Sequence, residues 1–164
     1  MRTRWFAATL GTVLALGVVL VVPTADLSAQ ANDPRIGTWK MNAAKSKFNP
    51  GPPPQSLTVT VESAAKGEKV TADIGNADGT RTTTVYTANF DGKNYPLTGS
   101  PTADTVSLKR VDSHTTERTD KKGDKIITTL RRVVSRDGKT MTVTTKGTNA
   151  EGQAVNNVIV FDKQ

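Results

Sequence analysis

The sequence has no cysteine, a single histidine and few aromatic residues, which make up 5% of its 164 positions. The absence of cysteine excludes disulfide bonds, a cysteine nucleophile and metal sites built on thiolates. One histidine disfavours histidine-rich metal sites and Ser-His-Asp hydrolysis. The chain also lacks a Gly-x-Ser-x-Gly elbow and a glycine-rich phosphate loop. We therefore expect no enzyme, no bound metal and no cofactor.

The longest apolar run lies at the N-terminus. Arg2 and Arg4 precede an uncharged run over residues 6–22, and the small residues of Ala29-Gln30-Ala31 follow. These parts predict a secretory signal peptide over residues 1–31, and hence an exported protein that is periplasmic or extracellular. A retained membrane anchor is the alternative, because the run is close to the shortest length that spans a bilayer. After cleavage we expect no membrane span.

The rest of the chain has the composition of strands. Residues 32–164 contain four leucines but 22 threonines, and β-branched side chains favour strands over helices. Apolar residues alternate with polar ones over 57–61, 70–74 and 141–144. Further candidate strands are 81–90, 104–111, 114–121, 124–135 and 154–162.

Short turns with glycine separate these candidate strands, as at Asp78-Gly79 and Asp137-Gly138. Such short connections require antiparallel pairing of sequence neighbours. The pattern predicts an all-β fold with a single antiparallel up-and-down β-barrel of about 8–10 strands. A Greek-key sandwich is the alternative.

The predicted domain layout has three parts: a signal peptide over 1–31, an N-terminal segment over 32–56, and barrel strands over 57–164 that form one domain with 32–56. Residues 49–56 are rich in proline and cannot form a helix or an interior strand. We expect them to cross one end of the barrel, with a recognition strap as the alternative. The small number of apolar residues predicts a narrow or partly polar lumen.

The start of the predicted mature chain, Gly37-Thr38-Trp39-Lys40, resembles the Gly-x-Trp opening of lipocalins and the wider calycin group. The resemblance implies that Gly37 and Trp39 close one barrel end, and that a late arginine packs over Trp39. This arginine is Arg131 or Arg132, and we assign it as Arg131. The chain also resembles small exported bacterial proteins of unassigned function, at Gly37–Lys40, Pro52-Pro53-Pro54 and Ser135–Val143. This second resemblance implies fold and compartment, but no activity.

Strand phase suggests a ligand site. Arg110 shares a face with Val106 and Leu108, Arg132 shares one with Leu130, and Tyr86 shares one with Ala88 and Phe90. If these faces line the lumen, Tyr86, Arg110 and Arg132 converge on an anionic head group, because guanidinium groups match carboxylates. The alternative places these arginines at strand ends with their charged groups in water.

The functional prediction is an exported, lipocalin-like binding protein for a small apolar or amphipathic ligand, anionic ligands included. The alternative is a ligand-free structural barrel that contacts an anionic cell-envelope partner, for which the net charge of +7 is suited. Nucleic-acid binding is not expected, because exposed aromatic residues are too few. We expect a monomer.

Overall fold

The computed structural model describes residues 33–164, so the predicted signal peptide lies outside the described residues. Within this range the chain forms ten strands and one short 3-10 helix. The elements are β1 (Gly37–Met41), η1 (Ala43–Lys45), β2 (Ser56–Ala64), β3 (Gly67–Gly75), β4 (Arg81–Asn89), β5 (Tyr95–Thr98), β6 (Thr105–Arg110), β7 (Thr115–Lys122), β8 (Lys125–Val134), β9 (Thr140–Thr148) and β10 (Ala154–Lys163).

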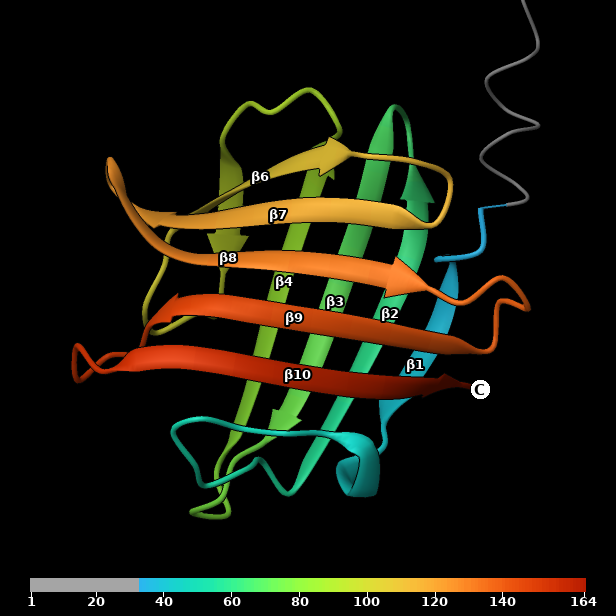
Figure 1. The fold of residues 1–164 in the computed structure, drawn as a ribbon. Coiled ribbons are helices and arrows are strands. Elements are labelled where there is room, and N and C mark those ends of the chain that lie inside the picture. The colour runs from blue at the N-terminus through green and yellow to red at the C-terminus, as the bar shows by residue number, and fades with distance from the viewer. Residues whose placement is uncertain (1–32) are drawn as a thin grey trace, which may run out of the picture.

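The ten strands form one closed antiparallel barrel (Figure 1). Each strand pairs with its sequence neighbours, and β1 pairs with β10 to complete the circle. The predicted up-and-down barrel is therefore confirmed and the Greek-key sandwich is wrong. Closure leaves no unpaired edge, which stabilises a chain that has no disulfide.

Alternation along the strands builds the core. Inward side chains such as Val61, Val70 and Leu108 are buried, whereas their sequence neighbours face outward. The turns follow the predicted chemistry: at the β3–β4 turn Gly79 has a φ of 86°, and Asp78 Oδ1 accepts a hydrogen bond of 2.9 Å from the Thr80 amide. Strand β5 was not among the predicted strands. It has only four residues, one of them Pro96.

Trp39 and Gly37 lie at one end of the barrel, which we call the closed end. Trp39 is fully buried, and its Nε1 donates a hydrogen bond of 2.8 Å to the Arg35 carbonyl. Lys163, paired with Trp39 across β1 and β10, places its Nζ 5.0 Å from the centre of the tryptophan ring. Glycine is favoured at position 37, because its φ of 132° is one that residues with a side chain rarely adopt.

The prediction that Arg131 packs over Trp39 is wrong. Arg131 lies on the outer face of β8, where its side chain is 50% exposed and donates a hydrogen bond of 2.6 Å from Nη1 to Glu117 Oε1. The phase of the strand explains the difference, since the neighbouring Arg132 takes the inward position. Lys163 supplies the cation that covers the ring.

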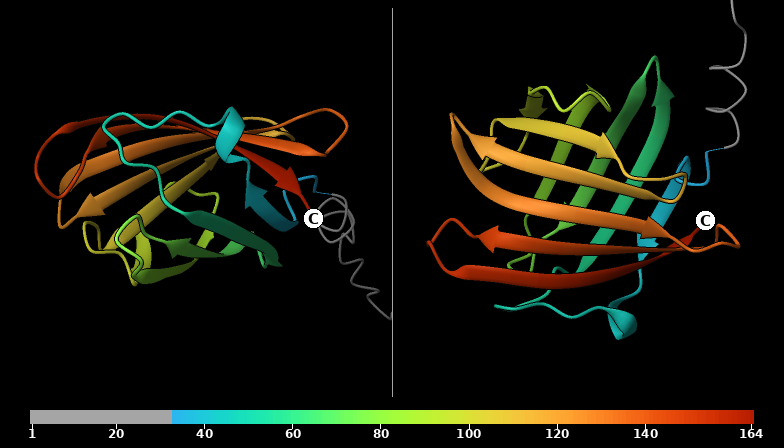
Figure 2. Two further views of the ribbon diagram at one scale, coloured as in Figure 1. Left: turned by 90° about the horizontal axis from the view of Figure 1, so that it is seen from below. Right: turned by 45° about the horizontal axis from the view of Figure 1, so that its top comes forward.

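The proline-rich segment crosses the opposite end of the barrel, which we call the proline end (Figure 2). Before the segment, the Lys47 amide donates to the Val158 carbonyl of β10 at 2.7 Å. After it, the Gln55 amide donates to the Gly75 carbonyl of β3 at 2.8 Å. The segment therefore spans the rim between two strands that are not neighbours in the barrel. Nowhere in residues 33–164 is there a helix with the length and apolar content needed to cross a bilayer.

Candidate functional site

The barrel encloses a cavity of about 220 Å³. Its wall is largely apolar and includes Leu57, Val59, Ala72, Met141, Val143 and Phe161. Arg118, Arg132 and three threonines, Thr84, Thr116 and Thr145, supply the polar part of the lining. The cavity is smaller than the roughly 300–1,000 Å³ of most ligand sites. It is thus narrow and partly polar, as the low apolar content predicts.

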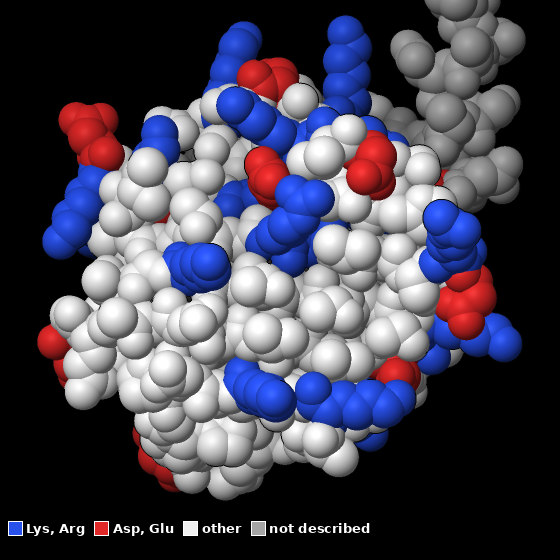
Figure 3. All heavy atoms as spheres, viewed as in Figure 1, with Lys and Arg blue, Asp and Glu red and all other residues white. Residues whose placement is uncertain are grey.

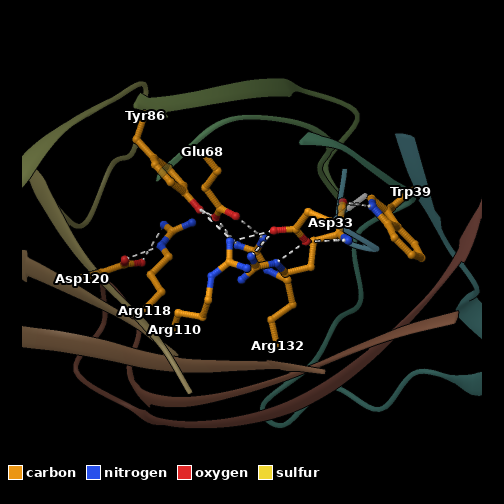
Figure 4. A network of polar contacts seen from close by, with 9 residues as sticks. Asp33, Trp39, Glu68, Tyr86, Arg110, Arg118, Asp120 and Arg132 are labelled. Atoms are coloured by element: carbon orange, nitrogen blue, oxygen red, sulfur yellow. Dashed lines mark hydrogen bonds and ion pairs between the residues drawn. The ribbon is translucent and has the colours of Figure 1, made fainter. Parts of the chain in front are cut away.

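Arg132 and Glu68 form a buried ion pair at the floor of the cavity (Figure 4). Arg132 Nη1 donates to Glu68 Oε2 at 3.1 Å and Nη2 donates to Oε1 at 2.9 Å. The Tyr86 hydroxyl donates to Glu68 Oε1 at 2.9 Å and accepts a bond of 3.1 Å from Arg132 Nη2. Strands β3, β4 and β8 are held together by these three side chains.

The ion pair affects the pKa of both groups that Arg132 contacts, the Glu68 carboxylate and the Tyr86 hydroxyl. Burial of Glu68 opposes ionisation, but the charge and hydrogen bonds of Arg132 outweigh burial, so the pKa of Glu68 lies below its usual value. Burial, together with the Glu68 charge, raises the pKa of Tyr86 to about 12. Glu68 is therefore a carboxylate and Tyr86 a neutral phenol at neutral pH.

Arg118 and Asp120 form a second ion pair beside the first. Arg118 Nε donates to Asp120 Oδ1 at 2.5 Å and Nη2 donates to Oδ2 at 2.8 Å. The Thr128 hydroxyl donates to Asp120 Oδ2 at 3.2 Å. The guanidinium carbon of Arg118 lies 4.8 Å from the centre of the Tyr86 ring, a cation–π contact that joins the two ion pairs.

A third cluster fills the closed end. Asp33 accepts hydrogen bonds from Arg35 Nε at 2.8 Å and from Arg110 Nη2 at 2.7 Å, and it also forms an ion pair with Arg35 Nη2. Both guanidinium groups lie against the Phe90 ring. Although burial of Asp33 opposes ionisation, its bonds to Arg35 and Arg110 lower its pKa to about 2. The cluster, with Trp39, blocks this end of the lumen.

The structure brings together two of the three residues predicted to hold a ligand. Arg132 lines the cavity and contacts Tyr86, which is covered by Arg118 and is not part of the lining. Arg110 faces inward, but it lies at the closed end in an ion pair with Asp33, and its side chain is 36% exposed. The three side chains therefore do not converge on a single head group.

Sequence reasoning missed the carboxylates that pair with these arginines. Glu68 lies two residues before Val70, and Asp120 lies two residues after Arg118. Glu68 therefore has the phase of an inward-facing apolar position, and this signal could have identified it. The alternate residues of β7, Thr116, Arg118 and Asp120, include no apolar side chain, so the sequence gives no such signal for Asp120. Among residues 33–164, no three His, Asp or Glu side chains lie close enough together to hold a metal ion.

No protein-family model matches the chain, and no curated protein matches it in sequence. Among solved structures, the chain is similar to the crystal structure of zebrafish ileal bile acid-binding protein complexed with cholic acid. The TM-score is 0.48 and the sequence identity is 14%, over 80% of this chain and 99% of the zebrafish chain. At this level of similarity the ligand of that protein is not transferred to this chain, whose site has to be interpreted from its own residues.

Proposed function

We propose that this chain is a binding protein that holds one small apolar or amphipathic molecule in its barrel. The observation that carries the proposal is the lumenal cavity, which combines an apolar wall with a floor of guanidinium groups. An apolar group that enters such a cavity leaves water at a gain of about 25 cal/mol per Å² of surface. The guanidinium floor can fix the orientation of one polar group of the ligand.

The cavity volume limits the size of the ligand. At about 20–30 Å³ per non-hydrogen atom, a cavity of about 220 Å³ holds on the order of ten such atoms. With roughly 0.8 kcal/mol per atom, such a ligand binds with a dissociation constant near 1 μM. We therefore expect a short chain or a small ring system rather than a long-chain lipid.

The proline end provides the entrance in this proposal. A hollow of about 350 Å³ lies there between the proline-rich segment and the β3–β4 and β9–β10 turns, lined by residues that include Phe48, Pro52, Ala77 and Asn149. The hollow shares Ile74 with the lumenal cavity. Because Trp39 and the ion pairs of Asp33 block the opposite end, the proline end is the end through which a ligand enters in this proposal.

The binding experiment is native mass spectrometry of the protein isolated from its natural source, with a delipidated sample as reference. Ala72→Phe places a ring in the cavity, whereas Ala150→Phe adds the same ring on the exposed β9–β10 turn and serves as the control. We expect one small adduct on the wild type and on A150F, and none on A72F. Absence of an adduct from every sample, together with no uptake of apolar probes by the delipidated protein, would refute the proposal.

Export of the protein is a separate part of the proposal, supported by the sequence pattern of residues 1–31. N-terminal sequencing of the protein from its natural host tests it. We expect the mature chain to begin near Asn32. A chain that begins before about residue 25 would contradict cleavage at Ala31.

The alternative of a ligand-free barrel that contacts an anionic envelope partner rests on the charge of the surface. Figure 3 shows lysine and arginine side chains spread over the face of β6–β10, with acidic side chains between some of them. Arg131, for example, is paired with Glu117 there. On this face the positive charge is thus interspersed with acidic side chains, which favours the lumen as the binding site.

A further inference from the structure

The charges at the floor of the cavity are balanced. Arg118 and Arg132 are the charged residues of the lining, and each forms two hydrogen bonds with its own carboxylate, Asp120 or Glu68. These carboxylates are themselves buried, with exposed fractions of 7% and 2%. The floor therefore presents two guanidinium groups without a net positive charge.

Two guanidinium nitrogens at this floor, Arg118 Nη1 and Arg132 Nε, have no hydrogen-bond partner among residues 33–164. Among residues 33–164, no group accepts a hydrogen bond from Arg118 Nη1, because Asp120 engages Nε and Nη2 of the same side chain. Arg132 differs, since both of its terminal nitrogens donate to Glu68. Arg118 is therefore the arginine of the lining whose terminal nitrogen can bind a polar group of a ligand without first losing a bond to Asp120.

An anionic ligand would disturb this balance. A carboxylate in the cavity would lie near Asp120 and Glu68 as well as the two arginines, and it would add one negative charge to two buried pairs that are already neutral. A neutral hydroxyl or carbonyl oxygen needs only one donor, and Arg118 Nη1 supplies it. The geometry therefore favours an uncharged acceptor over a charged one.

We infer that the lumen selects neutral, mainly apolar molecules with one hydroxyl or carbonyl group and rejects carboxylates, and that Asp120 is the residue that determines this specificity. The inference rests on the proposed function, since it assumes that the cavity is a ligand site. It differs from the expectation that arginines in the lumen hold an anionic head group. The reason is that each arginine of the lining already has a carboxylate partner.

The test compares octan-1-ol with octanoate, which differ in one terminal group, by isothermal titration calorimetry of the delipidated protein at pH 7. For the wild type we expect octan-1-ol to bind at least about tenfold more tightly. Asp120→Asn frees the charge of Arg118, so we expect octanoate to gain about tenfold in affinity while octan-1-ol changes less than about threefold. Asp73→Asn is the control, because Asp73 is exposed on β3 and its replacement alters the net charge without touching the cavity.

A second measurement uses the unmutated protein, in case D120N does not fold. Free carboxylic acids titrate near pH 4–5, so most octanoic acid is neutral at pH 4. We expect its affinity to rise at least about fivefold between pH 7 and pH 4, while that of octan-1-ol stays constant. Equal or tighter binding of octanoate than octan-1-ol at pH 7 overturns the inference but leaves the lumenal site intact. If neither compound binds, and the delipidated protein takes up no other apolar probe, the proposed function itself is overturned.

Discussion

The buried pair of Glu68 and Arg132 allows a quantitative prediction about stability. Glu68→Gln keeps the shape of the side chain but removes the charge that faces Arg132, whose side chain is 9% exposed. The guanidinium then remains buried without a counter-charge, and removing one member of a buried pair costs about 3–5 kcal/mol. Because domains of this size unfold at about 5–15 kcal/mol, we expect E68Q to lose a large part of its stability.

Replacing both partners should restore much of this loss. In the double variant E68Q/R132M no charge is left unpaired, and the amide introduced at position 68 can still accept the hydrogen bond that the Tyr86 hydroxyl gives to Glu68 at 2.9 Å in the wild type. We expect the double variant to lie within about 2 kcal/mol of the wild type. The two single substitutions are therefore non-additive, with a coupling energy of about 3 kcal/mol or more.

Urea unfolding of the four proteins, followed by circular dichroism, measures the cycle. Glu117→Gln is the matched control, because it removes the exposed partner of Arg131 and should cost less than about 1 kcal/mol. The reasoning is refuted if E68Q unfolds within about 1 kcal/mol of the wild type. It is equally refuted if the effects of E68Q and R132M simply add.

Three other contacts each lead to a measurable expectation. Since the pKa of Tyr86 is raised to about 12, its contribution to stability is complete below pH 10 and is lost as the pH rises from 10 to 12. In an absorbance titration, Tyr86→Phe, which retains only Tyr95, should lack the tyrosine ionisation near pH 12. A titration curve identical to that of the wild type would contradict this. Since the pKa of Asp33 is lowered to about 2, its contribution to stability is present above about pH 4 and is lost as the pH falls toward 2. Between pH 4 and pH 2, the free energy of unfolding of Asp33→Asn should therefore depend less on pH than that of the wild type. An identical dependence would argue against the ion pairs of Asp33 with Arg35 and Arg110. Gly99→Ala should lower the free energy of unfolding by at least about 2 kcal/mol in thermal unfolding, because Gly99 has a φ of 77° and a Cβ there would lie 1.9 Å from the Thr83 carbonyl oxygen. Gly79→Ala is the control: it has open space around it and should cost about 1 kcal/mol. Equal losses would show that the backbone shifts to remove the clash with Thr83.

The barrel was predictable because its determinants are local. Period-two alternation and glycine turns such as Asp78-Gly79 act over a few residues, and short connections leave only antiparallel neighbours. Strand β5 was missed because Tyr95–Thr98 is too short to show alternation and contains a proline. The pairing of Trp39 with Lys163 was missed because it depends on the register of β1 against β10, which are far apart in the sequence.

The site was predictable only in part. Strand phase correctly placed Tyr86 and Arg132 inside the barrel. However, phase shows only on which face of its strand a side chain lies, and not how far along the lumen it lies. Arg110 therefore shares the inward face while lying at the closed end, beside Asp33. The phase of Glu68 relative to Val70 indicates an inward position, but it does not identify Arg132 as the partner, because that pairing joins strands β3 and β8, which are far apart in the sequence.

The measurement that tests the central claim most directly is the ¹³C methyl signal of Met141 during titration of the delipidated wild type with octan-1-ol. Met141 is fully buried and lines the cavity, whereas Met41 on β1 does not line it and is the internal reference. We expect a saturable shift of the Met141 signal and little change at Met41. If the Met141 signal stays constant while octan-1-ol reaches millimolar concentration, the lumen does not bind such ligands and the account of this protein as a binding barrel is contradicted.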